Sequence, residues 1–203
     1  NAVGAEVVLY DGNEKLKIED IEKKLGTYKA EIVLGELTKE LTDSSDLLVI
    51  SPGVPIDSPV VKAFEAAGVP VWGEVELAYA FDKGKVLAIT GTNGKTTTTA
   101  LVGQIVGAYH KDTFVVGNIG NPYTTEVLKS NKDSYTVAEI SSFQLETVHE
   151  FHPLVSAILN ITPDHLNRHY TMDCYVQTKE KIAMNQKGSE VCVLNFDDDY
   201  LRE

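Results

Sequence analysis

The sequence predicts an α/β protein built on parallel strands, and three observations support this fold class. Short apolar runs alternate with helical patterns along the 203 residues, an order typical of strands joined by helical crossovers. Hydrophobic residues make up 43% and charged residues 24% of the chain, which favours a globular protein over a disordered or fibrous one. The segment AITGTNGKTTTT, at 88–99, lies between an apolar strand and a helix, as phosphate-binding turns of α/β domains do.

Residues 1–83 are expected to form a Rossmann-like domain. Strands are expected at 7–10, 32–34 and 47–50, and helices at 18–25 and 59–67. The first strand closes on Asp11 and Gly12, as does the second strand of a dinucleotide-binding half, where the acidic residue normally contacts a ribose or base. A preceding strand with its glycine-rich turn would lie about 20 residues upstream. We therefore expect this N-terminal domain to be incomplete, with its first strand missing.

Residues 84–203 are expected to form part of a P-loop-type parallel-sheet ATPase domain, joined to the first domain by the polar stretch DKGK at 82–85. Strands are expected at 85–90, 113–117, 134–141, 154–162 and 190–196. Helices are expected at 96–109, 124–130 and 173–186.

Charge and composition exclude several classes of protein. Thirty acidic against eighteen basic residues give a net charge of −12, which argues against a general affinity for nucleic acid. No apolar run approaches the ~18 residues of a membrane span, and the first residues lack a signal-peptide pattern, so we expect a cytoplasmic protein without membrane attachment. Cys174 and Cys192 have neither metal-ligand spacing nor a disulfide framework, and we expect both to be reduced packing residues.

The segment 88–99 carries the strongest chemical signal. Unpaired backbone N–H groups and the helix dipole at a helix start favour an anion, and Gly91 and Gly94 allow the turn and the approach of a phosphate. Lys95 is placed to reach phosphate oxygens, and the Thr96 hydroxyl to ligate Mg²⁺. The full G-x-x-x-x-G-K-[ST] pattern is not met, because isoleucine occupies its first glycine position. The alternative is a turn before a threonine-rich helix start; the strand-to-helix context favours phosphate binding.

Two further candidates, Glu139 and His165, follow apolar runs that predict strands. Because ligands collect at the carboxyl ends of parallel strands, we expect both residues at the same edge as Lys95. Glu139 is an oxygen donor suited to Mg²⁺, and its alternative is a solvated strand end. Imidazole is an uncommon magnesium ligand, so for His165 a metal role and a local hydrogen-bonding role stay equally open.

Lys179 interrupts an apolar stripe on the helix predicted at 173–186. The other members of the stripe are Met172, Tyr175, Val176, Ile182 and Ala183. Desolvation lowers the pKa of an inward-facing lysine, and the neutral amine can react with CO₂ to give a carbamate, an oxygen ligand for a second Mg²⁺. The residues alone favour the alternative, a lysine whose stem covers apolar surface while its amine reaches water.

The segments TGTNGKTTTT, VVGNIG, AEISSFQLE and NITPDHLNRH occur in this order, and through them the chain resembles the Mur ligase family over nearly its whole length. SPGVP, EVELA and SSFQLE are most similar to the members that add D-glutamate to UDP-N-acetylmuramoyl-L-alanine. The resemblance implies a cytoplasmic, ADP-forming carboxylate–amine ligase of peptidoglycan synthesis that uses ATP and one or two Mg²⁺ ions, and we expect a monomer. The alternatives are another Mur ligase, a folylpolyglutamate synthase-like ligase, or a nucleotide-binding module without catalysis.

The resemblance also implies roles for matching positions. The loop that cradles ATP comprises Gly91, Thr92, Asn93, Gly94, Lys95, Thr96 and Thr97. Lys95, Glu139, His165 and Lys179 are implied to be catalytic, and the implied metal ligands are Thr96, Glu139, His165 and carbamylated Lys179. The implied contacts to the UDP-muramoyl substrate are Asp11, Gly12, Ser51, Pro52, Gly53, Asn118 and Ser141.

Two departures from the family pattern affect these expectations. Asn167 stands where the family usually has aspartate. Full-length members continue past the position of Glu203 with the rest of the ATP-binding domain and a C-terminal domain. We therefore expect this piece alone to be inactive.

Overall fold

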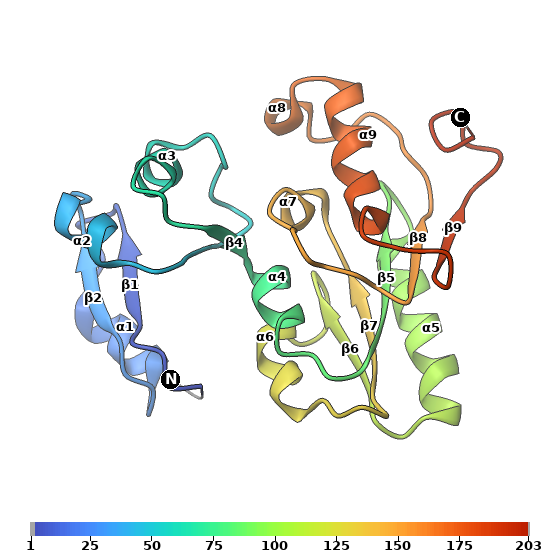
Figure 1. The fold of residues 1–203 in the computed structure, drawn as a ribbon, viewed down its shortest axis with the longest axis horizontal. Helices are drawn as coiled ribbons and strands as arrows, with labels where there is room; N and C mark the ends of the chain where they lie inside the picture. Colours follow the sequence, from blue (N-terminus) through green and yellow to red (C-terminus); the bar gives the residue numbers. More distant parts are fainter. Residues whose placement is uncertain (1–2, 203) are drawn as a thin grey trace. The chain divides into compact units, whose positions relative to one another are not determined.

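The computed structural model describes residues 3–202, and the chain divides into two compact units, 1–45 and 46–203. The described residues form three sheets, all with parallel pairing, which Figure 1 shows as arrows. The predicted α/β fold class with parallel strands is confirmed. The boundary predicted between residues 83 and 84 lies inside the second unit and stays a prediction.

The first unit holds a two-stranded parallel sheet. Its elements are β1 (Val8–Asp11), α1 (Ile18–Leu25), β2 (Glu31–Leu34) and α2 (Lys39–Ser44). The Tyr10 hydroxyl donates a hydrogen bond to the Gly35 backbone oxygen at 2.8 Å, which ties the ends of β1 and β2 together. Asp11 and Gly12, at the end of β1, are exposed. The Asp11 side chain accepts the Asn13 backbone N–H at 2.8 Å and so shapes the turn after the strand.

The second unit begins with a small parallel sheet and a connecting helix. Its first elements are β3 (Leu48–Ile50), α3 (Pro59–Ala66), β4 (Val71–Gly73) and α4 (Glu74–Tyr79). α3 begins as its sequence predicts, with proline in the first turn and the Ser58 hydroxyl accepting the Val61 N–H. β3 pairs with β4 from Leu48 opposite Val71 to Ile50 opposite Gly73.

Two buried or partly buried carboxylates fix the connection between the small sheet and the large one. Glu76 on α4 is buried, and its carboxylate accepts three successive backbone N–H groups at 149–151, at 2.7–3.2 Å. Asp82 accepts a tyrosine hydroxyl, a threonine hydroxyl and a backbone N–H at 2.7–2.8 Å. The polar stretch 82–85, expected as a linker, is therefore hydrogen-bonded to the elements of the large sheet.

The large sheet has five parallel strands in the order β6-β7-β5-β8-β9. The strands are β5 (Lys85–Thr90), β6 (Thr113–Gly117), β7 (Tyr135–Glu139), β8 (Val155–Ile158) and β9 (Val191–Leu194). The central strand β5 pairs with both β7 and β8. The loop that follows β5 therefore lies in the middle of the carboxyl edge of the sheet.

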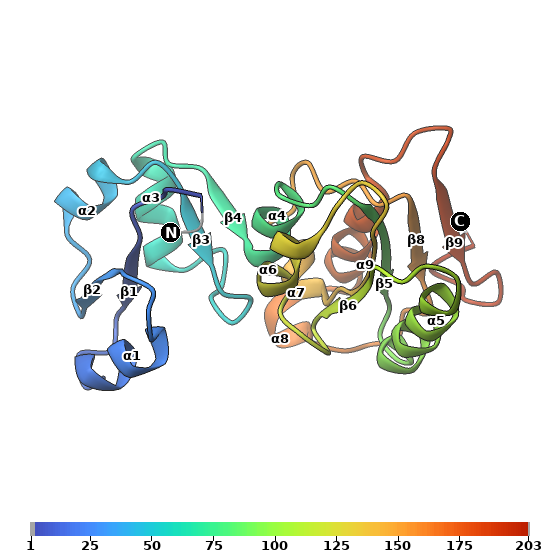
Figure 2. The ribbon, with the colours of Figure 1, turned by 90° about the horizontal axis from the view of Figure 1, so that it is seen from below.

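The helices that follow β5 lie around the large sheet (Figures 1 and 2). They are α5 (Lys95–Tyr109), α6 (Tyr123–Glu126), α7 (Ser142–Leu145), α8 (Leu166–His169) and α9 (Met172–Glu180), with 3-10 turns at Val127–Lys129 and Lys181–Ala183. α5 packs along β5, β6 and β7. A buried apolar cluster joins the sheet to α4, α6, α7 and α9. The described helices include none that is long and apolar enough to cross a membrane.

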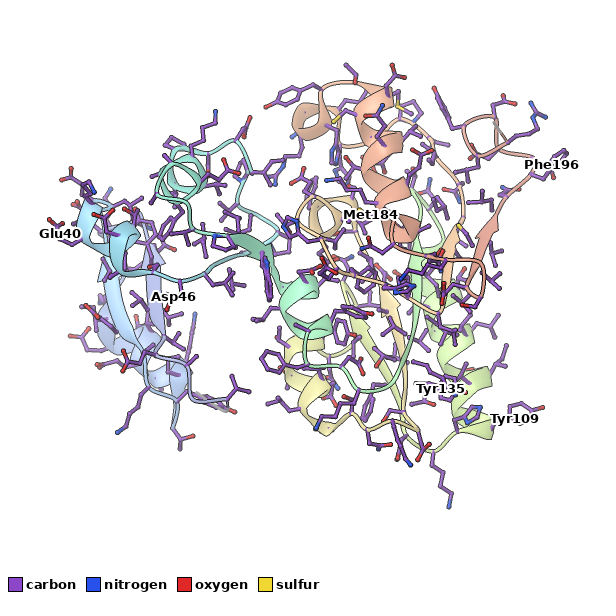
Figure 3. All side chains as sticks on the ribbon, in the orientation of Figure 1. Glu40, Asp46, Tyr109, Tyr135, Met184 and Phe196 are labelled. Carbon is purple, nitrogen blue, oxygen red and sulfur yellow. The ribbon has the colours of Figure 1, made fainter. Side chains whose placement is uncertain are left out.

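Most of the strands and helices predicted for this unit are present, with shifted ends. The strand predicted at 154–162 is shorter, because after Ile158 the chain leaves the ladder and hydrogen-bonds to the loop that follows β5. The helix predicted at 173–186 is α-helical only to Glu180 and then tightens into a 3-10 turn. Aromatic side chains at Tyr109, the end of α5, and at Phe196, after β9, are exposed (Figure 3).

The prediction that both cysteines are packing residues was wrong. Cys174 and Cys192 are both exposed, and neither forms a disulfide. Cys174 lies on α9 outside the buried stripe that includes Tyr175 and Lys179. Cys192 lies on β9, an edge strand whose four residues are all exposed. Position on an element, rather than residue type, decides their exposure.

Candidate functional site

The loop between β5 and α5 is shaped by two glycines with positive φ. Gly91 has φ 145° and Gly94 has φ 83°, and a Cβ atom at Gly91 would lie 3.1 Å from the Leu159 Cβ. Gly94 is the N-cap of α5, and no side chain caps this helix start. The first N–H groups of a 15-residue helix are therefore left to bind an anion. The loop residues that face outward are Asn93, Gly94, Thr96 and Thr97.

Two lysine amines meet at one carbonyl oxygen of this loop. The Lys95 amine donates to the backbone oxygens of Gly91 and Thr92, both at 2.9 Å. The Lys179 amine, from α9, donates to the same Gly91 oxygen at 2.9 Å. Two ammonium groups that donate to the same oxygen lie close together, and their positive charges repel each other. The prediction that Lys95 lies at the helix start is confirmed, and Lys179 belongs to the buried stripe of α9.

Lys179 is buried with its amine inside the protein. Only 1% of the residue is exposed, so the alternative of an amine that reaches water is wrong. The pKa of Lys179 is lowered from 10.5 to about 7, chiefly by burial and also by the charge of Lys95, while Asp164 opposes the shift. The amine also lies 4.6 Å from the centre of the Tyr175 ring. A share of Lys179 is therefore neutral, and nucleophilic, near neutral pH.

Glu139 ends β7 at the carboxyl edge, opposite Ile89 of β5. It is 1% exposed, which rules out a solvated strand end. One carboxylate oxygen accepts the Asn118 side-chain N–H at 2.9 Å, and the other has no hydrogen-bond partner. An unpartnered, buried carboxylate oxygen is costly unless a cation or a donor joins it. This oxygen fits the requirement of a divalent cation for a hard ligand.

His165 does not join Glu139 in a ready-made metal site. It is the N-cap of α8 with φ 52°, its side chain is 48% exposed, and its ring lies 4.9 Å from the Phe143 ring. Its nearest charged partner is Asp164, with Nε2 and Oδ2 3.6 Å apart. Within residues 3–202, no three acidic, histidine or cysteine side chains are grouped so that they could hold a metal ion.

Ser141 and Asn118 flank Glu139. The Ser141 hydroxyl caps α7: it accepts the Gln144 N–H at 3.3 Å and donates to the Gln144 side-chain oxygen at 2.9 Å. Since the hydroxyl hydrogen is in use, Ser141 has only a lone pair left for a ligand. The capping role of Gln144 was not predicted, although the sequence SSFQ has the S-x-x-Q spacing of a capping box.

The loop after β3, which contains Ser51, Pro52 and Gly53, is tied to α8. Arg168 donates to the Val54 backbone oxygen at 2.9 Å, and the Tyr170 hydroxyl donates to Asp57 at 2.8 Å. Arg168 also forms a two-point ion pair with Glu146, and both side chains are largely buried. The contacts to Val54 and Asp57 were not predicted, because they join segments more than 100 residues apart.

Two family models match the chain. Residues 89–203 match the Mur ligase middle domain, and residues 2–73 match the MurD-like N-terminal domain of Mur ligases.

Curated relatives match along the whole chain. The chain is 69% identical to the UDP-N-acetylmuramoylalanine–D-glutamate ligase of Lachnospira eligens, over 100% of the chain and 45% of the relative. It is 58% identical to the enzyme of the same name from Lachnoclostridium phytofermentans, over 98% of the chain and 44% of the relative. The chain thus spans less than half the length of these relatives.

Solved structures share the fold at low sequence identity. The ligase MPL of Neisseria meningitides superposes with a TM-score of 0.60 at 17% identity, over 99% of this chain and 67% of that one. The MurF ligase of Thermotoga maritima, solved in complex with ADP, superposes with a TM-score of 0.54 at 19% identity, over 100% of this chain and 46% of that one.

Proposed function

The chain belongs to the Mur ligase family, whose members named above act in peptidoglycan synthesis, and we propose that the complete protein adds D-glutamate to UDP-N-acetylmuramoyl-L-alanine with ATP. The observation that carries this proposal is that the amines of Lys95 and Lys179 meet at the Gly91 oxygen, close to the uncapped start of α5 at Gly94. Because the chain spans 45% of the length of its relative, the activity is assigned to the complete protein and not to this piece.

The loop is suited to the phosphates of ATP. The N-terminus of α5 favours negative charge, and the glycine conformations keep side chains away from the approach. On nucleotide binding we expect Lys95 to exchange two neutral carbonyl acceptors for phosphate oxygens, since hydrogen bonds between charged partners are stronger. The Mur ligase structure that contains ADP supports the choice of nucleotide.

The residues present fit one or two Mg²⁺ ions only in part. Glu139 offers a buried oxygen without a partner, and Thr96 is exposed at the helix start. His165 is half exposed beside Asp164, and Lys179 would become a ligand only as a carbamate. Bound Mg²⁺ supplies charge that lowers the repulsion between ATP and an anionic substrate. The lowered pKa of Lys179 favours carbamylation, in which the neutral amine attacks CO₂ and a proton is released.

The proposed reaction has two steps. The carboxylate of the UDP-muramoyl substrate attacks the γ-phosphorus of ATP, giving an acyl phosphate and ADP. The amine of D-glutamate then attacks the acyl carbon, and phosphate leaves through a tetrahedral intermediate. Both reactants of the first step are anions, so the ammonium of Lys95 and the start of α5 contribute by stabilising the transferred phosphoryl group.

The UDP-muramoyl substrate is proposed to contact residues at or after the ends of strands. These are Asp11, Gly12, Ser51, Pro52, Gly53, Asn118 and Ser141. Asn118 donates its side-chain N–H to Glu139, so a substrate bound there would lie beside the proposed metal ligand. We further propose that the protein is cytoplasmic and monomeric. Light scattering on the purified complete protein would test the oligomeric state.

The direct test is ADP release by the complete protein. We expect sustained release over many turnovers only when both UDP-N-acetylmuramoyl-L-alanine and D-glutamate are present with Mg-ATP. Equal turnover with another amino acid would contradict the proposed specificity and favour another Mur ligase. Turnover with a folate substrate would favour a folylpolyglutamate synthase-like ligase. Release of ADP without any carboxylate substrate would favour a nucleotide-binding module.

A further inference from the structure

The segment that continues β8 is hydrogen-bonded first to the last residue of β5 and then to the phosphate loop. β8 ends at Ile158, and the next N–H, of Leu159, donates to the Thr90 oxygen at 3.0 Å. The Thr92 N–H then donates to the Asn160 backbone oxygen at 2.9 Å. The chain after β8 therefore follows the loop as the loop leaves β5.

The Asn160 side chain binds both backbone polar groups of one loop residue. Its oxygen accepts the Asn93 N–H at 2.8 Å, and its amide nitrogen donates to the Asn93 oxygen at 3.0 Å. Asparagine can do this because its carboxamide carries a donor and an acceptor side by side. With the backbone bond to Thr92, Asn160 makes three hydrogen bonds to two successive loop residues.

Thr162 extends the same contact. Its N–H donates to the Thr92 hydroxyl oxygen at 3.0 Å, and the Thr92 hydroxyl lies 3.2 Å from the Thr162 backbone oxygen. The Thr92 hydroxyl is also 3.2 Å from the Tyr175 hydroxyl on α9. The loop at 92–93 is thus held from one side by the segment 160–162, directly before the uncapped start of α5.

We propose that Asn160 is a positioning residue of the phosphate loop, acting through the backbone of Asn93. It holds the loop open in the conformation that presents the N–H groups of Gly94, Lys95 and Thr96 to phosphate before nucleotide arrives, so that binding does not have to order the loop. This inference rests on the proposed function in one respect, the identity of the ligand as a nucleotide polyphosphate. Asn160 itself is not proposed to touch the nucleotide.

The test compares Asn160→Ala with Asn185→Ala in the complete protein. Asn185 is a matched control, because its amide also donates to two backbone oxygens, of His149 and Phe151 at 2.7 and 3.0 Å, and not to the loop. For Asn160→Ala we expect the ADP dissociation constant, measured by calorimetry, and the KM for ATP to rise about tenfold, the effect of one to two hydrogen bonds. The KM for D-glutamate should stay within about twofold, and Asn185→Ala should leave all three unchanged.

Amide hydrogen exchange supplies a readout that does not depend on activity. In Asn160→Ala the Asn93 amide should exchange faster, while amides of the interior strand β7 keep their protection. In Asn160→Asp the acceptor for the Asn93 N–H remains, so this amide should stay protected. The lost donor and the added negative charge near the phosphates should nevertheless weaken ADP binding more than Asn160→Ala does. This second variant keeps the test decisive if Asn160→Ala folds poorly.

Three outcomes would overturn the inference. Unchanged ADP affinity in both Asn160 variants, with a wild type that binds ADP, would show that the loop needs no such support. Equal losses in Asn160→Ala and Asn185→Ala would show a general effect on stability. A wild type that binds no nucleotide would overturn the proposed function, and this inference with it.

Discussion

The phosphate loop and the proposed metal ligands follow strands of the same sheet, yet only the loop is assembled by the chain alone. The loop is held by hydrogen bonds from Asn160, and two lysine amines converge on Gly91. Glu139, in contrast, has a buried oxygen without a partner, His165 is half exposed, and within residues 3–202 no three acidic, histidine or cysteine side chains are grouped to hold a metal ion. Hydrogen bonds can fix neutral backbone in advance, whereas the oxygens of a metal site lack partners until a cation binds.

Lys95→Ala tests the phosphate loop and has the largest expected effect. The substitution removes the charge that we propose stabilises the transferred phosphoryl group, so kcat for ADP release in the complete protein should fall by roughly a thousandfold. Lys85→Ala is the matched control, because Lys85 lies at the exposed start of β5 and donates to the Tyr135 hydroxyl. More than about a tenth of wild-type activity in Lys95→Ala would contradict the role.

Glu139→Gln tests the proposed metal ligands. Glutamine keeps an oxygen that can accept the Asn118 hydrogen bond and removes only the charge. We expect kcat to fall about a hundredfold and half-maximal activity to require more Mg²⁺, as a magnesium titration would show. Glu126→Gln is the control, since Glu126 is also a buried carboxylate but is bound by Asn121 and Lys129. An unchanged magnesium titration in Glu139→Gln would argue against metal binding there.

Lys179→Ala tests whether the buried lysine serves the proposed metal site as well as the phosphate loop. If it serves as a carbamate, its loss should lower kcat by roughly thirtyfold, and acetate or propionate should restore part of the activity by supplying a carboxylate. Bicarbonate should not help, because no amine remains to react. The absence of extra mass on Lys179 under CO₂, together with no rescue by carboxylic acids, would count against the carbamate and leave the phosphate loop unaffected.

The smallest expected effect is on the pH dependence of stability. The pKa of Lys179 is about 7 in the folded protein, against the ordinary lysine value of 10.5 that applies to the unfolded chain. At a pH between these two values, the unfolded chain binds a proton that the folded chain does not. Stability from this group should therefore rise with pH across that range. Lys179→Met should make the urea midpoint less dependent on pH between about pH 7.5 and 9. Equal slopes in wild type and variant would show that the amine is charged when folded.

Long elements with strong patterns could be predicted from the sequence. β5 and β6 were predicted with their observed bounds, since unbroken apolar runs bounded by polar residues leave little choice. The helical stripe placed Lys179 among apolar residues, but the residues alone favoured an amine that reaches water, and the burial of Lys179 shows that this interpretation was wrong. Helices of four residues, such as α7 and α8, were missed because one turn gives too few positions to show a period.

The contacts that complete the site depend on register between distant segments. Asn160 reaches Asn93 only because β8 pairs with β5 and the chain then leaves the ladder at Ile158. Arg168 reaches Val54 only through the packing of α8 near the loop after β3. No periodicity in the sequence carries this information, which is why a motif could indicate the loop but not what holds it.

The most direct test of the central claim is a structure of the complete protein with a non-hydrolysable ATP analogue. We expect the phosphates at the start of α5, with the Lys95 amine moved from the Gly91 and Thr92 oxygens to the phosphate tail and Asn160 still bound to Asn93. A nucleotide bound elsewhere, with the loop unchanged and Lys95 still on those carbonyls, would contradict the account.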